Sequence, residues 1–283
     1  MSDCAQLAPT ARNWKLTLAY DGTDFSGWQI QPGQPTIQGT LQLALGRITG
    51  ESPLPQGSGR TDAGVHAVGQ VASFVLNAPI PPGNLLRALN RILPSSIRVR
   101  DAQIVDDTFH ARHSAKAKTY EYRVYLEKSA AGTSNCPPFL ARYVYAYPWP
   151  LDVDTLRESA AHFIGEHDFL SFAATDPDLA ARESAPQPDT APLIATPART
   201  AVRTIYSSIW EREQISGGEL FVYRVRGNGF LHHMVRNLVG TMLDVGRGYR
   251  RASEIPAMLA ARTRSAAGPT APASGLFLHS VEY

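Results

Sequence analysis

The sequence predicts an α+β protein, in which strands and amphipathic helices alternate along 283 residues. Two observations support this class. Segments of alternating apolar and polar residues, typical of strands, are separated by segments whose apolar residues recur every three or four positions, typical of helices. A hydrophobic content of 43% and a charged content of 18% supply the core that one large domain or two ordinary ones require.

The first hundred residues predict the order strand, helix, strand, helix, strand. Trp14–Tyr20 alternates and ends at Asp21-Gly22, and Thr36 is suited to cap a helix with apolar residues at helical spacing. The elements that follow are a strand at Gln70–Leu76, a helix that opens at Pro81-Pro82 and ends at Pro94, and a strand at Ile97–Ile104.

The second half continues in the same style, without a visible internal repeat. Ser216-Gly217-Gly218 between two alternating segments is a hairpin signal, and Gly246 is placed to end a strongly apolar helix. The expected strands are Thr119–Leu126, Arg142–Tyr147, Ala201–Glu211, Glu219–Gly227 and Leu276–Tyr283, and the expected helices are Asp152–Ile164, a segment from Leu231 to Leu243, and Ser253–Ala261.

The domain organisation that we expect has three parts. Residues 1–11 form an extended or disordered N-terminus, residues 12–112 an N-terminal α+β domain, and residues 113–283 a C-terminal α+β domain. Residues 175–197 contain five prolines and many small side chains, so they can bury little surface and are expected to form a flexible insertion.

Composition argues against several classes of protein. No apolar run is long enough to span a bilayer, and the N-terminal segment lacks the apolar region of a signal peptide, so we expect a cytoplasmic protein. Cys4 and Cys136 are the only cysteines, and their wide spacing favours neither a disulfide framework nor a metal site. A net charge of +2 neither requires nor excludes a polyanionic partner.

Three groups of residues have the composition of a functional site. The first is the glycine-rich segment Gly57–His66, which holds Arg60 and Asp62 between glycines. Glycines let a chain turn tightly and a large partner approach, and a single carboxylate can act as nucleophile or general base. The spacing matches neither a P-loop nor a dinucleotide fingerprint. Taken alone, the segment also fits a capped turn with a surface ion pair.

The second group is the basic and aromatic segment from Phe109 to Tyr122. Basic groups contact phosphates and aromatic rings stack on unpaired bases, which suits RNA, although a solvated basic surface is the alternative. Tyr120 and Tyr122 lie on one side of an alternating strand, where they either stack a base or pack as ordinary strand aromatics. The other members are Phe109, His110, Ala111, Arg112, His113, Lys116 and Lys118.

The third group is Asn228–Asn237 at the start of the apolar helix. We expect His232 and Arg236, four residues apart, to project from one polar face of that helix. Adjacent histidines such as His232 and His233 cannot easily share one ion, and no HExxH or CxxC pattern is present, so no metal site is predicted. The alternative is that these side chains satisfy hydrogen bonds at a domain interface.

Together the three groups resemble one family. Gly59–His66 followed by Gly69-Gln70-Val71 is similar to the signature of the TruA family of tRNA pseudouridine synthases. Further blocks match in the family's order along nearly the whole chain, which argues against coincidence. They are Tyr20-Asp21-Gly22, Gly27-Trp28-Gln29, Phe109–Arg112, Tyr120 and Tyr122, Gly165–Phe169, Phe230–Asn237 and Gly275-Leu276-Phe277.

The resemblance implies an isomerase that converts uridine to pseudouridine at positions 38, 39 and 40 in the anticodon arm of tRNAs. It implies the pseudouridine synthase fold, with two ferredoxin-like α+β domains, a continuous and mainly antiparallel sheet, and the active cleft between them. It also implies a homodimer, because both subunits of family members grip one tRNA. The isomerisation changes no oxidation state and loses no leaving group, so no cofactor is expected.

The resemblance also implies roles for individual residues. Asp62 is the implied nucleophile, Tyr120 stacks on the uracil, and Arg236 pairs with Asp62. Arg60 is implied to enter the RNA helix and help flip the base, a step that costs a few kcal/mol of stacking and pairing. RNA contact is implied for Phe109, His110, Ala111, Arg112 and His113, and supporting roles for His232, His233, Lys116, Lys118 and Arg199.

Two departures from the family pattern concern the grip on tRNA. Residues 175–197 are longer than expected and lie where a tRNA-contacting loop should be, and Asn77–Gly83 carries no basic residue. The alternative function is a non-catalytic RNA-binding or RNA-folding protein of the same fold, which would have no reason to hold Asp62, Tyr120 and Arg236 together. A metal-dependent nuclease would need clustered carboxylates or histidine ligands, which the sequence lacks.

Overall fold

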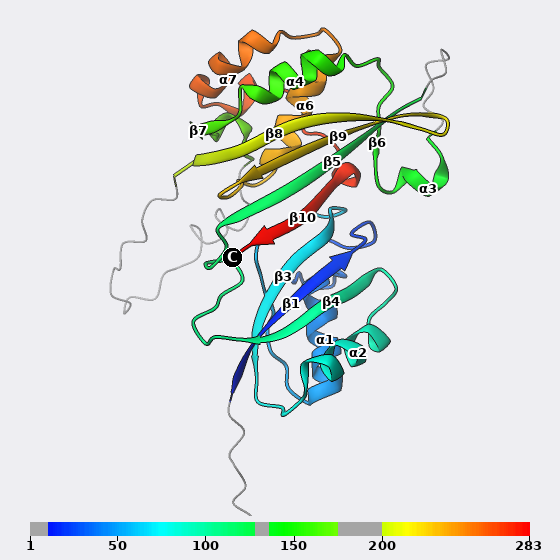
Figure 1. Ribbon diagram of the computed structural model, residues 1–283, viewed down its shortest axis with the longest axis vertical. Helices are drawn as coiled ribbons and strands as arrows, with labels where there is room; N and C mark the ends of the chain where they lie inside the picture. The colour runs from blue at the N-terminus through cyan, green and yellow to red at the C-terminus, as the bar shows by residue number, and fades with distance from the viewer. Residues whose placement is uncertain (1–10, 128–135, 175–199) are drawn as a thin grey trace, which may run out of the picture. The chain divides into compact units, whose positions relative to one another are not determined.

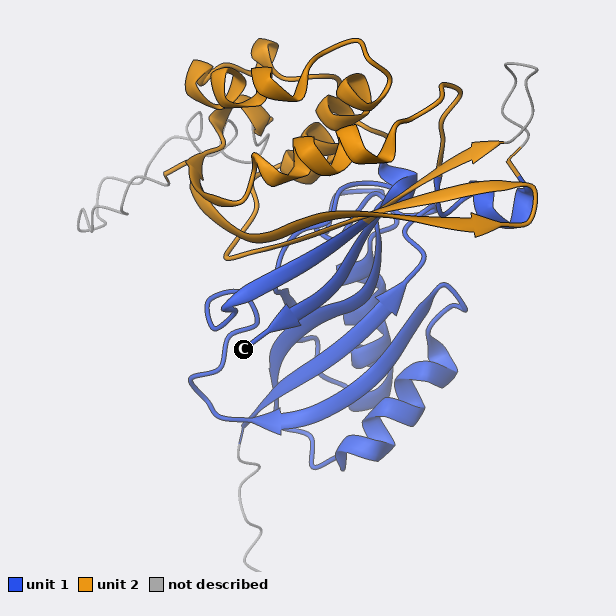
Figure 2. Ribbon diagram, turned by 45° about the horizontal axis from the view of Figure 1, so that its top comes forward, with its two compact units in different colours: residues 1–121, 137–144, 273–283 blue, residues 122–136, 145–272 orange. Residues whose placement is uncertain are grey.

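The computed structural model describes residues 11–127, 136–174 and 200–283, which form two compact units (Figure 1; Figure 2). Unit 1 comprises the chain up to Glu121 together with Pro137–Val144 and Ala273–Tyr283, and unit 2 comprises Tyr122–Cys136 and Tyr145–Pro272. Each unit combines helices with mainly antiparallel strands, which confirms the predicted α+β class. The expected insertion at 175–197 and all but the last residue of the expected N-terminal tail lie outside the described residues.

Unit 1 is built on a sheet with the strand order β4-β1-β3-β10 (Figure 1). Strand β1 is antiparallel to both β3 and β4, whereas β10 runs parallel to β3. Trp14, Leu16 and Leu18 alternate along β1 and are fully buried, so the period of two gives this strand its core face. The strands of unit 1 are β1 (Arg12–Tyr20), β2 (Gln56–Gly57), β3 (His66–Leu76), β4 (Ile97–Val105), β10 (Leu276–Glu282) and the first part of β5 (Ala117–Glu127).

Two helices of unit 1 begin where the sequence predicts. Helix α1 (Ile37–Thr49) is capped by Thr36, whose side chain accepts a hydrogen bond from the Gly39 amide, and it ends at Gly50 with a φ of 74°. Helix α2 (Pro82–Ile92) starts at a proline and packs against β4, with Leu85 and Leu89 in the core. Both helices lie on the same face of the sheet (Figure 1).

Unit 2 contains the strands that follow the part of β5 from Tyr122 onward in the order β9-β8-β7. Strands β8 and β9 form the predicted hairpin, which turns at Gly217 with a φ of 85°. The β8 residue Trp210 packs on Tyr223 of β9 with 5.1 Å between ring centroids. The strands are β6 (Tyr145–Ala146), which pairs in parallel with β5, β7 (Gly165–Asp168), β8 (Val202–Ile215) and β9 (Gly218–Gly227).

Helices cover one face of the unit 2 sheet (Figure 1). Helix α6 (Met234–Gly246) is almost entirely buried and contacts α4 (Val153–Ala161), while α7 (Ile255–Ala261) follows a turn of 3-10 helix at Ala252–Glu254. The backbone of Pro269 crosses α6 so closely that a Cβ at Gly240 would lie 1.7 Å from the Pro269 oxygen. Within the described ranges, no helix has the length and apolar character needed to cross a membrane.

The sequence-based prediction missed the short strands β2 and β7, and two further segments differ from it. Arg142–Tyr147 is not one strand: prolines at 137 and 138 start the short helix α3 (Pro138–Ala141), and only Tyr145–Ala146 joins the sheet. The apolar helix begins at Met234 rather than at Leu231, because His233 has a φ of 57° and the His232 carbonyl accepts a hydrogen bond from the Ala174 amide. His232 therefore precedes the helix, and the expectation that it shares a helical face with Arg236 is wrong.

Candidate active site

The glycine-rich segment forms a loop between β2 and β3 whose backbone is fixed at several points. We call residues 58–65 the catalytic loop. The Ser58 amide donates to the Val71 carbonyl at 2.8 Å, and the Gly59 carbonyl accepts from Gln70 Nε2 at 2.9 Å. The Thr61 carbonyl accepts from the Trp28 amide at 3.0 Å. Because these contacts use main-chain atoms of the loop, they do not depend on the side chain at position 62.

The Arg60 and Asp62 side chains emerge from this fixed backbone. Arg60 is exposed, while Asp62 is partly buried. Thr61 between them points the other way, into the core, where its hydroxyl lies 2.9 Å from the Tyr20 hydroxyl. The loop closes at Gly64, whose φ of 77° is one that glycine adopts easily and whose amide donates to the Phe25 carbonyl at 3.2 Å.

Two glycines outside the loop allow the segment after β1 to pack directly on it. A Cβ at Gly22 would lie 2.0 Å from the Val65 oxygen, and a Cβ at Gly27 would lie 2.5 Å from the Thr61 oxygen. Both contacts are between main chains, so no side-chain rotation could relieve them. The close packing of this segment on the catalytic loop therefore requires glycine at positions 22 and 27.

Tyr120 on β5 lies near the catalytic loop in unit 1. Its side chain is buried, and burial raises the pKa of the phenol well above its usual value, with further increases from Tyr20 and the Asp62 carboxylate. Tyr120 therefore stays a neutral phenol throughout the physiological range. Beside a carboxylate, the ring of a neutral tyrosine can stack on a nucleobase and its hydroxyl can donate a hydrogen bond. The neutral phenol does not act as the general base that removes a proton.

The segment expected to contact RNA is a turn between β4 and β5. Arg112 and His113 are exposed, whereas the Ala111 methyl group is fully buried and the Phe109 ring packs on Tyr283 with centroids 4.9 Å apart. The His110 Nδ1 accepts from the Arg112 amide at 3.0 Å. Burial, the nearby His113 and the Arg112 guanidinium together lower the pKa of His110. Arg112 and His113 thus present the polar groups of this turn to solvent.

The third group of residues lies in unit 2. Arg236 is in the first turn of α6, and its guanidinium donates from Nε to the Ala271 carbonyl at 2.7 Å. The Ala271 amide in turn donates to the Arg236 carbonyl at 3.1 Å, so the residue is held at both ends. The His232 and His233 rings pack against each other in a tilted arrangement, with centroids 3.9 Å apart. Arg199 lies outside the described residues.

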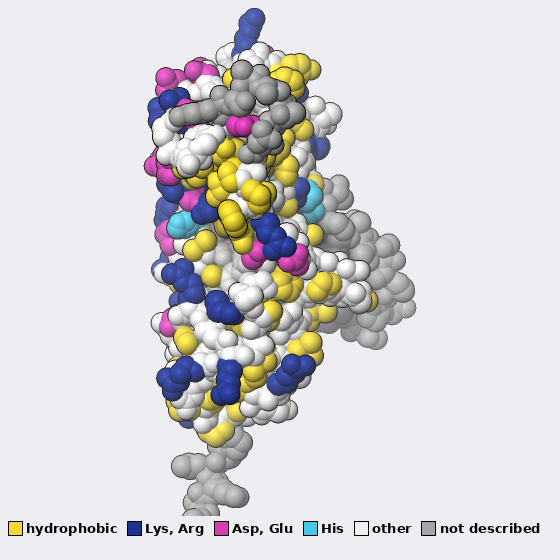
Figure 3. All heavy atoms as spheres, turned by 90° about the vertical axis from the view of Figure 1, so that its right-hand side faces the viewer, with side chains coloured by type: hydrophobic (Ala, Val, Ile, Leu, Met, Phe, Trp, Pro, Cys, Tyr) yellow, Lys and Arg dark blue, Asp and Glu magenta, His cyan; other side chains and the backbone are white. Residues whose placement is uncertain are grey.

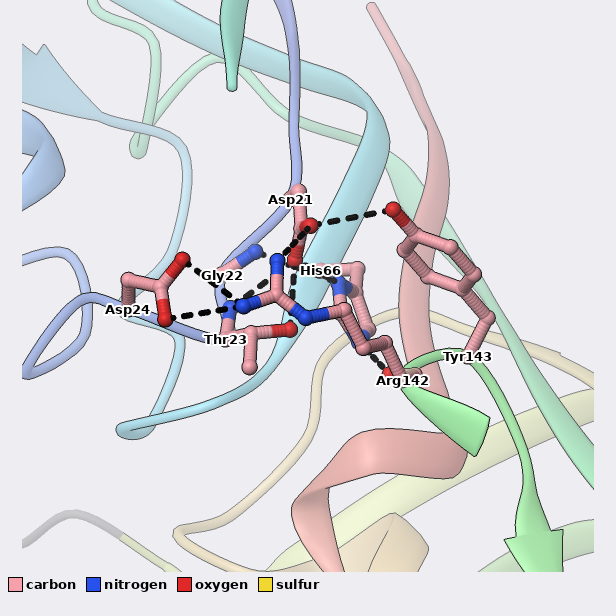
Figure 4. Close-up of polar contacts among 7 residues, drawn as sticks. All are labelled: Asp21, Gly22, Thr23, Asp24, His66, Arg142 and Tyr143. Carbon is pink, nitrogen blue, oxygen red and sulfur yellow. Dashed lines mark hydrogen bonds and ion pairs between the residues drawn. The ribbon is translucent and has the colours of Figure 1, made fainter. Parts of the chain in front are cut away.

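One polar cluster in unit 1 was not predicted from the sequence (Figure 4). Asp21 accepts hydrogen bonds from the Thr23 hydroxyl at 2.6 Å and the Tyr143 hydroxyl at 3.0 Å. Arg142 donates to both oxygens of Asp24 at 3.1 Å and to Asp21 at 3.3 Å. The buried His66 lies against the same cluster, with Nδ1 3.1 Å from the Gly22 amide and Nε2 3.0 Å from the Arg142 carbonyl. Segment 137–144 is thereby bonded to Asp21 and Asp24, which follow β1, and to His66, which follows the catalytic loop.

The Asp21 carboxylate should make folding stability depend on pH. Burial raises its pKa, but hydrogen bonds from Thr23 and Tyr143 outweigh burial and hold the pKa below its usual range. The pKa of Asp21 is lower in the folded protein than in the unfolded chain. The carboxylate therefore contributes its full share of the free energy of unfolding above about pH 4, and this share is lost as the pH falls through the native pKa. We expect Asp21→Asn to lower the free energy of unfolding by about 1 kcal/mol at neutral pH, and the two proteins to converge in acid.

Denaturant unfolding of both proteins between about pH 3 and about pH 7 measures this difference. Asp107→Asn, at an exposed turn position, is the control and should follow the unsubstituted protein throughout. A constant difference between Asp21→Asn and the unsubstituted protein over the whole range would mean that the carboxylate charge has no such role.

Comparison with known proteins identifies the chain. A family model described as tRNA pseudouridine synthase matches residues 17–114 and 189–283, more than half of the chain. The tRNA pseudouridine synthase A of Solibacter usitatus is 46% identical over 96% of this chain and 100% of its own length. Proteins of the same name from Bacillus pumilus and Caldicellulosiruptor bescii are 43% and 39% identical, over 95% and 96% of this chain and 98% and 100% of their own lengths.

These matches show that the chain is an isomerase. More specifically, it belongs to the tRNA pseudouridine synthase family. A solved structure titled as an unknown protein from Galdieria sulphuraria covers 81% of this chain and 88% of its own, but at 13% identity and a TM-score of 0.21 it carries no argument.

Proposed function

We propose that the protein converts uridine to pseudouridine at positions 38, 39 and 40 in the anticodon arm of tRNAs, with Asp62 as the nucleophile. Membership of the family supports the reaction and the tRNA substrate. The single observation that carries the assignment of Asp62 is the fixed main chain of the catalytic loop, which presents this one carboxylate beside the buried Tyr120 ring. A reaction centre for a large substrate needs such a preorganised group.

The chemistry explains why one carboxylate is enough. The bond between C1′ of the ribose and N1 of the uracil breaks, and a bond between C1′ and C5 forms in its place. The hydrogen on C5 leaves as a proton and N1 gains one, so nothing is oxidised or reduced. Asp62 would add either to C1′ or to C6 of the uracil, and both routes need an ionised carboxylate.

Other side chains would prepare the base and the nucleophile. In this proposal Tyr120 stacks on the flipped uracil, a role that suits a buried ring whose phenol stays neutral. Arg60, exposed on the catalytic loop, enters the RNA helix and offsets part of the cost of flipping. Arg236 forms an ion pair with Asp62 and keeps its carboxylate ionised, for which its fixed guanidinium is suited.

The surface of unit 1 is suited to a polyanion. Lys and Arg side chains are spread over the lower half of the face in Figure 3, with few acidic side chains visible among them. Arg112 and His113 on the turn before β5 would contact phosphates, and His110 would orient that turn through its hydrogen bond to the Arg112 amide. We further propose that the protein works in the cytoplasm as a homodimer, as expected from the family resemblance.

Mapping of the product tests the function and its positions. Transcripts of one tRNA with uridine at 38, 39 and 40 are incubated with the purified protein, digested and analysed for pseudouridine at each position. We expect pseudouridine at these three positions and none in a transcript that carries cytidine there. Pseudouridine at other positions would contradict the proposed specificity, and RNA binding without any pseudouridine would favour the non-catalytic alternative.

A further inference from the structure

The side chain of Lys118 contacts the first residue of the catalytic loop. Its Nζ donates to the Ser58 carbonyl at 2.6 Å, four residues before Asp62. A Cβ at Gly59 would lie only 3.1 Å from the same nitrogen, so the glycine leaves room for the ammonium group. The contact joins β5, two residues before Tyr120, to the start of the loop. Lys118 thus connects the two segments that hold the proposed nucleophile and the proposed stacking ring.

The surroundings of Lys118 disfavour its charge. Burial and, to a smaller extent, the nearby Arg112 guanidinium together lower the pKa of the ammonium to about 8. The catalytic loop that packs on it contributes Arg60 and Asp62, and its own strand contributes Tyr120, which stays neutral. A lysine that is kept where its charged form is costly, and that contacts the loop bearing the proposed nucleophile, points to a functional role.

We propose that Lys118 is a positioning residue: its charged hydrogen bond to the Ser58 carbonyl fixes the catalytic loop, and the loss of its proton at mildly alkaline pH releases the loop and slows the reaction. The inference rests on the proposed function. A neutral amine still donates a hydrogen bond, but a weaker one than an ammonium group does. Displacement of the nucleophile by about 1 Å is enough to cost about 100-fold in rate.

Unfolding cannot explain such an alkaline loss through this group. The native pKa of Lys118 lies below that of an exposed lysine, so the folded protein binds fewer protons than the unfolded chain between the two values. Folding stability from this group therefore rises, rather than falls, as the pH increases through that interval. Activity and stability are expected to change in opposite directions, which separates positioning from a merely structural role.

The test is the pH dependence of kcat/KM for tritium release from tRNA labelled at C5 of uridine, between about pH 6.5 and about pH 9. The unsubstituted protein should lose up to about tenfold per pH unit above about pH 8. Lys118→Arg, which keeps its charge, should rescue activity at the alkaline end. Lys118→Met should be at least about tenfold slower near neutral pH and show no such decline.

Arg98→Met is the matched control, because Arg98 is an exposed cation on β4 that also donates to main-chain carbonyls. It should keep the pH profile of the unsubstituted protein. An alkaline decline that persists in Lys118→Arg, or full activity of Lys118→Met, would overturn the inference.

A second measurement does not depend on catalysis. Amide hydrogen exchange of residues 58–64 should be faster in Lys118→Met than in the unsubstituted protein, while exchange in β1 stays the same. If the unsubstituted protein forms no pseudouridine, the proposed function fails, but this comparison still decides whether Lys118 holds the loop. Equal exchange of the loop in the two proteins would contradict the positioning role.

Discussion

Asp62→Asn is expected to lower pseudouridine formation by more than about 1,000-fold while the affinity for tRNA changes by less than about threefold. The amide has the shape of the carboxylate but cannot attack C1′ or C6. The loop keeps its geometry, because the Ser58, Gly59 and Thr61 main-chain contacts that fix it do not involve the side chain at 62. Phosphate contacts made elsewhere should still bind the RNA.

Single-turnover pseudouridine formation and a filter-binding isotherm, measured on the same preparation, provide the two readouts. Asp154→Asn, an exposed carboxylate on α4, should retain both activities. Asp62→Ala guards against slow conversion of the asparagine back to aspartate. Turnover of either Asp62 variant within about tenfold of the unsubstituted protein would rule out the carboxylate as nucleophile.

The second large effect is expected from Gly22→Ala, a substitution outside the catalytic loop. The new methyl carbon would lie 2.0 Å from the Val65 oxygen and 2.6 Å from its carbonyl carbon, so one main chain must move. Val65 ends the catalytic loop, and the displacement should reach Asp62. We expect the free energy of unfolding to fall by about 2–4 kcal/mol and kcat/KM to fall by more than about tenfold.

Gly83→Ala tests whether the effect is specific to this position. A Cβ at Gly83 would meet only Arg87 Nη1, at 3.7 Å, and the residue lies in the first turn of α2, where alanine is a better helix former. This variant should unfold at the same denaturant concentration or a higher one. Gly22→Ala with the unfolding midpoint and activity of the unsubstituted protein would show that the two loops are not packed as described.

Local sequence signals predicted most elements of both units. Thr36 caps α1, prolines bound α2, and the Gly217 turn joins β8 to β9, because each of these signals acts through neighbours a few residues away. The start of α6 was misplaced for the opposite reason. The His232 carbonyl accepts a hydrogen bond from Ala174, which is distant in sequence, and apolar periodicity contains no information about that partner.

In the candidate site, too, features that depend on neighbouring residues could be predicted and features that depend on distant residues could not. The motif around Asp62 could be found in the sequence because its glycines and charged residues are adjacent. The cluster of Asp21, Arg142 and Tyr143 could not, since Asp21 is about 120 residues from the other two and no local pattern links them. Lys118 was assigned only a supporting role, because its burial and its contact with Ser58 depend on the fold.

Release of tritium from C5-labelled uridine in tRNA tests the proposed chemistry most directly. The bond from C1′ to C5 cannot form unless the hydrogen on C5 leaves, so tritium should enter water in a 1:1 ratio to pseudouridine formed, with no free uracil. The unsubstituted protein should show this release and Asp62→Asn should not. Absence of release under conditions in which the unsubstituted protein binds the tRNA, or equal release by both proteins, would contradict isomerisation by Asp62.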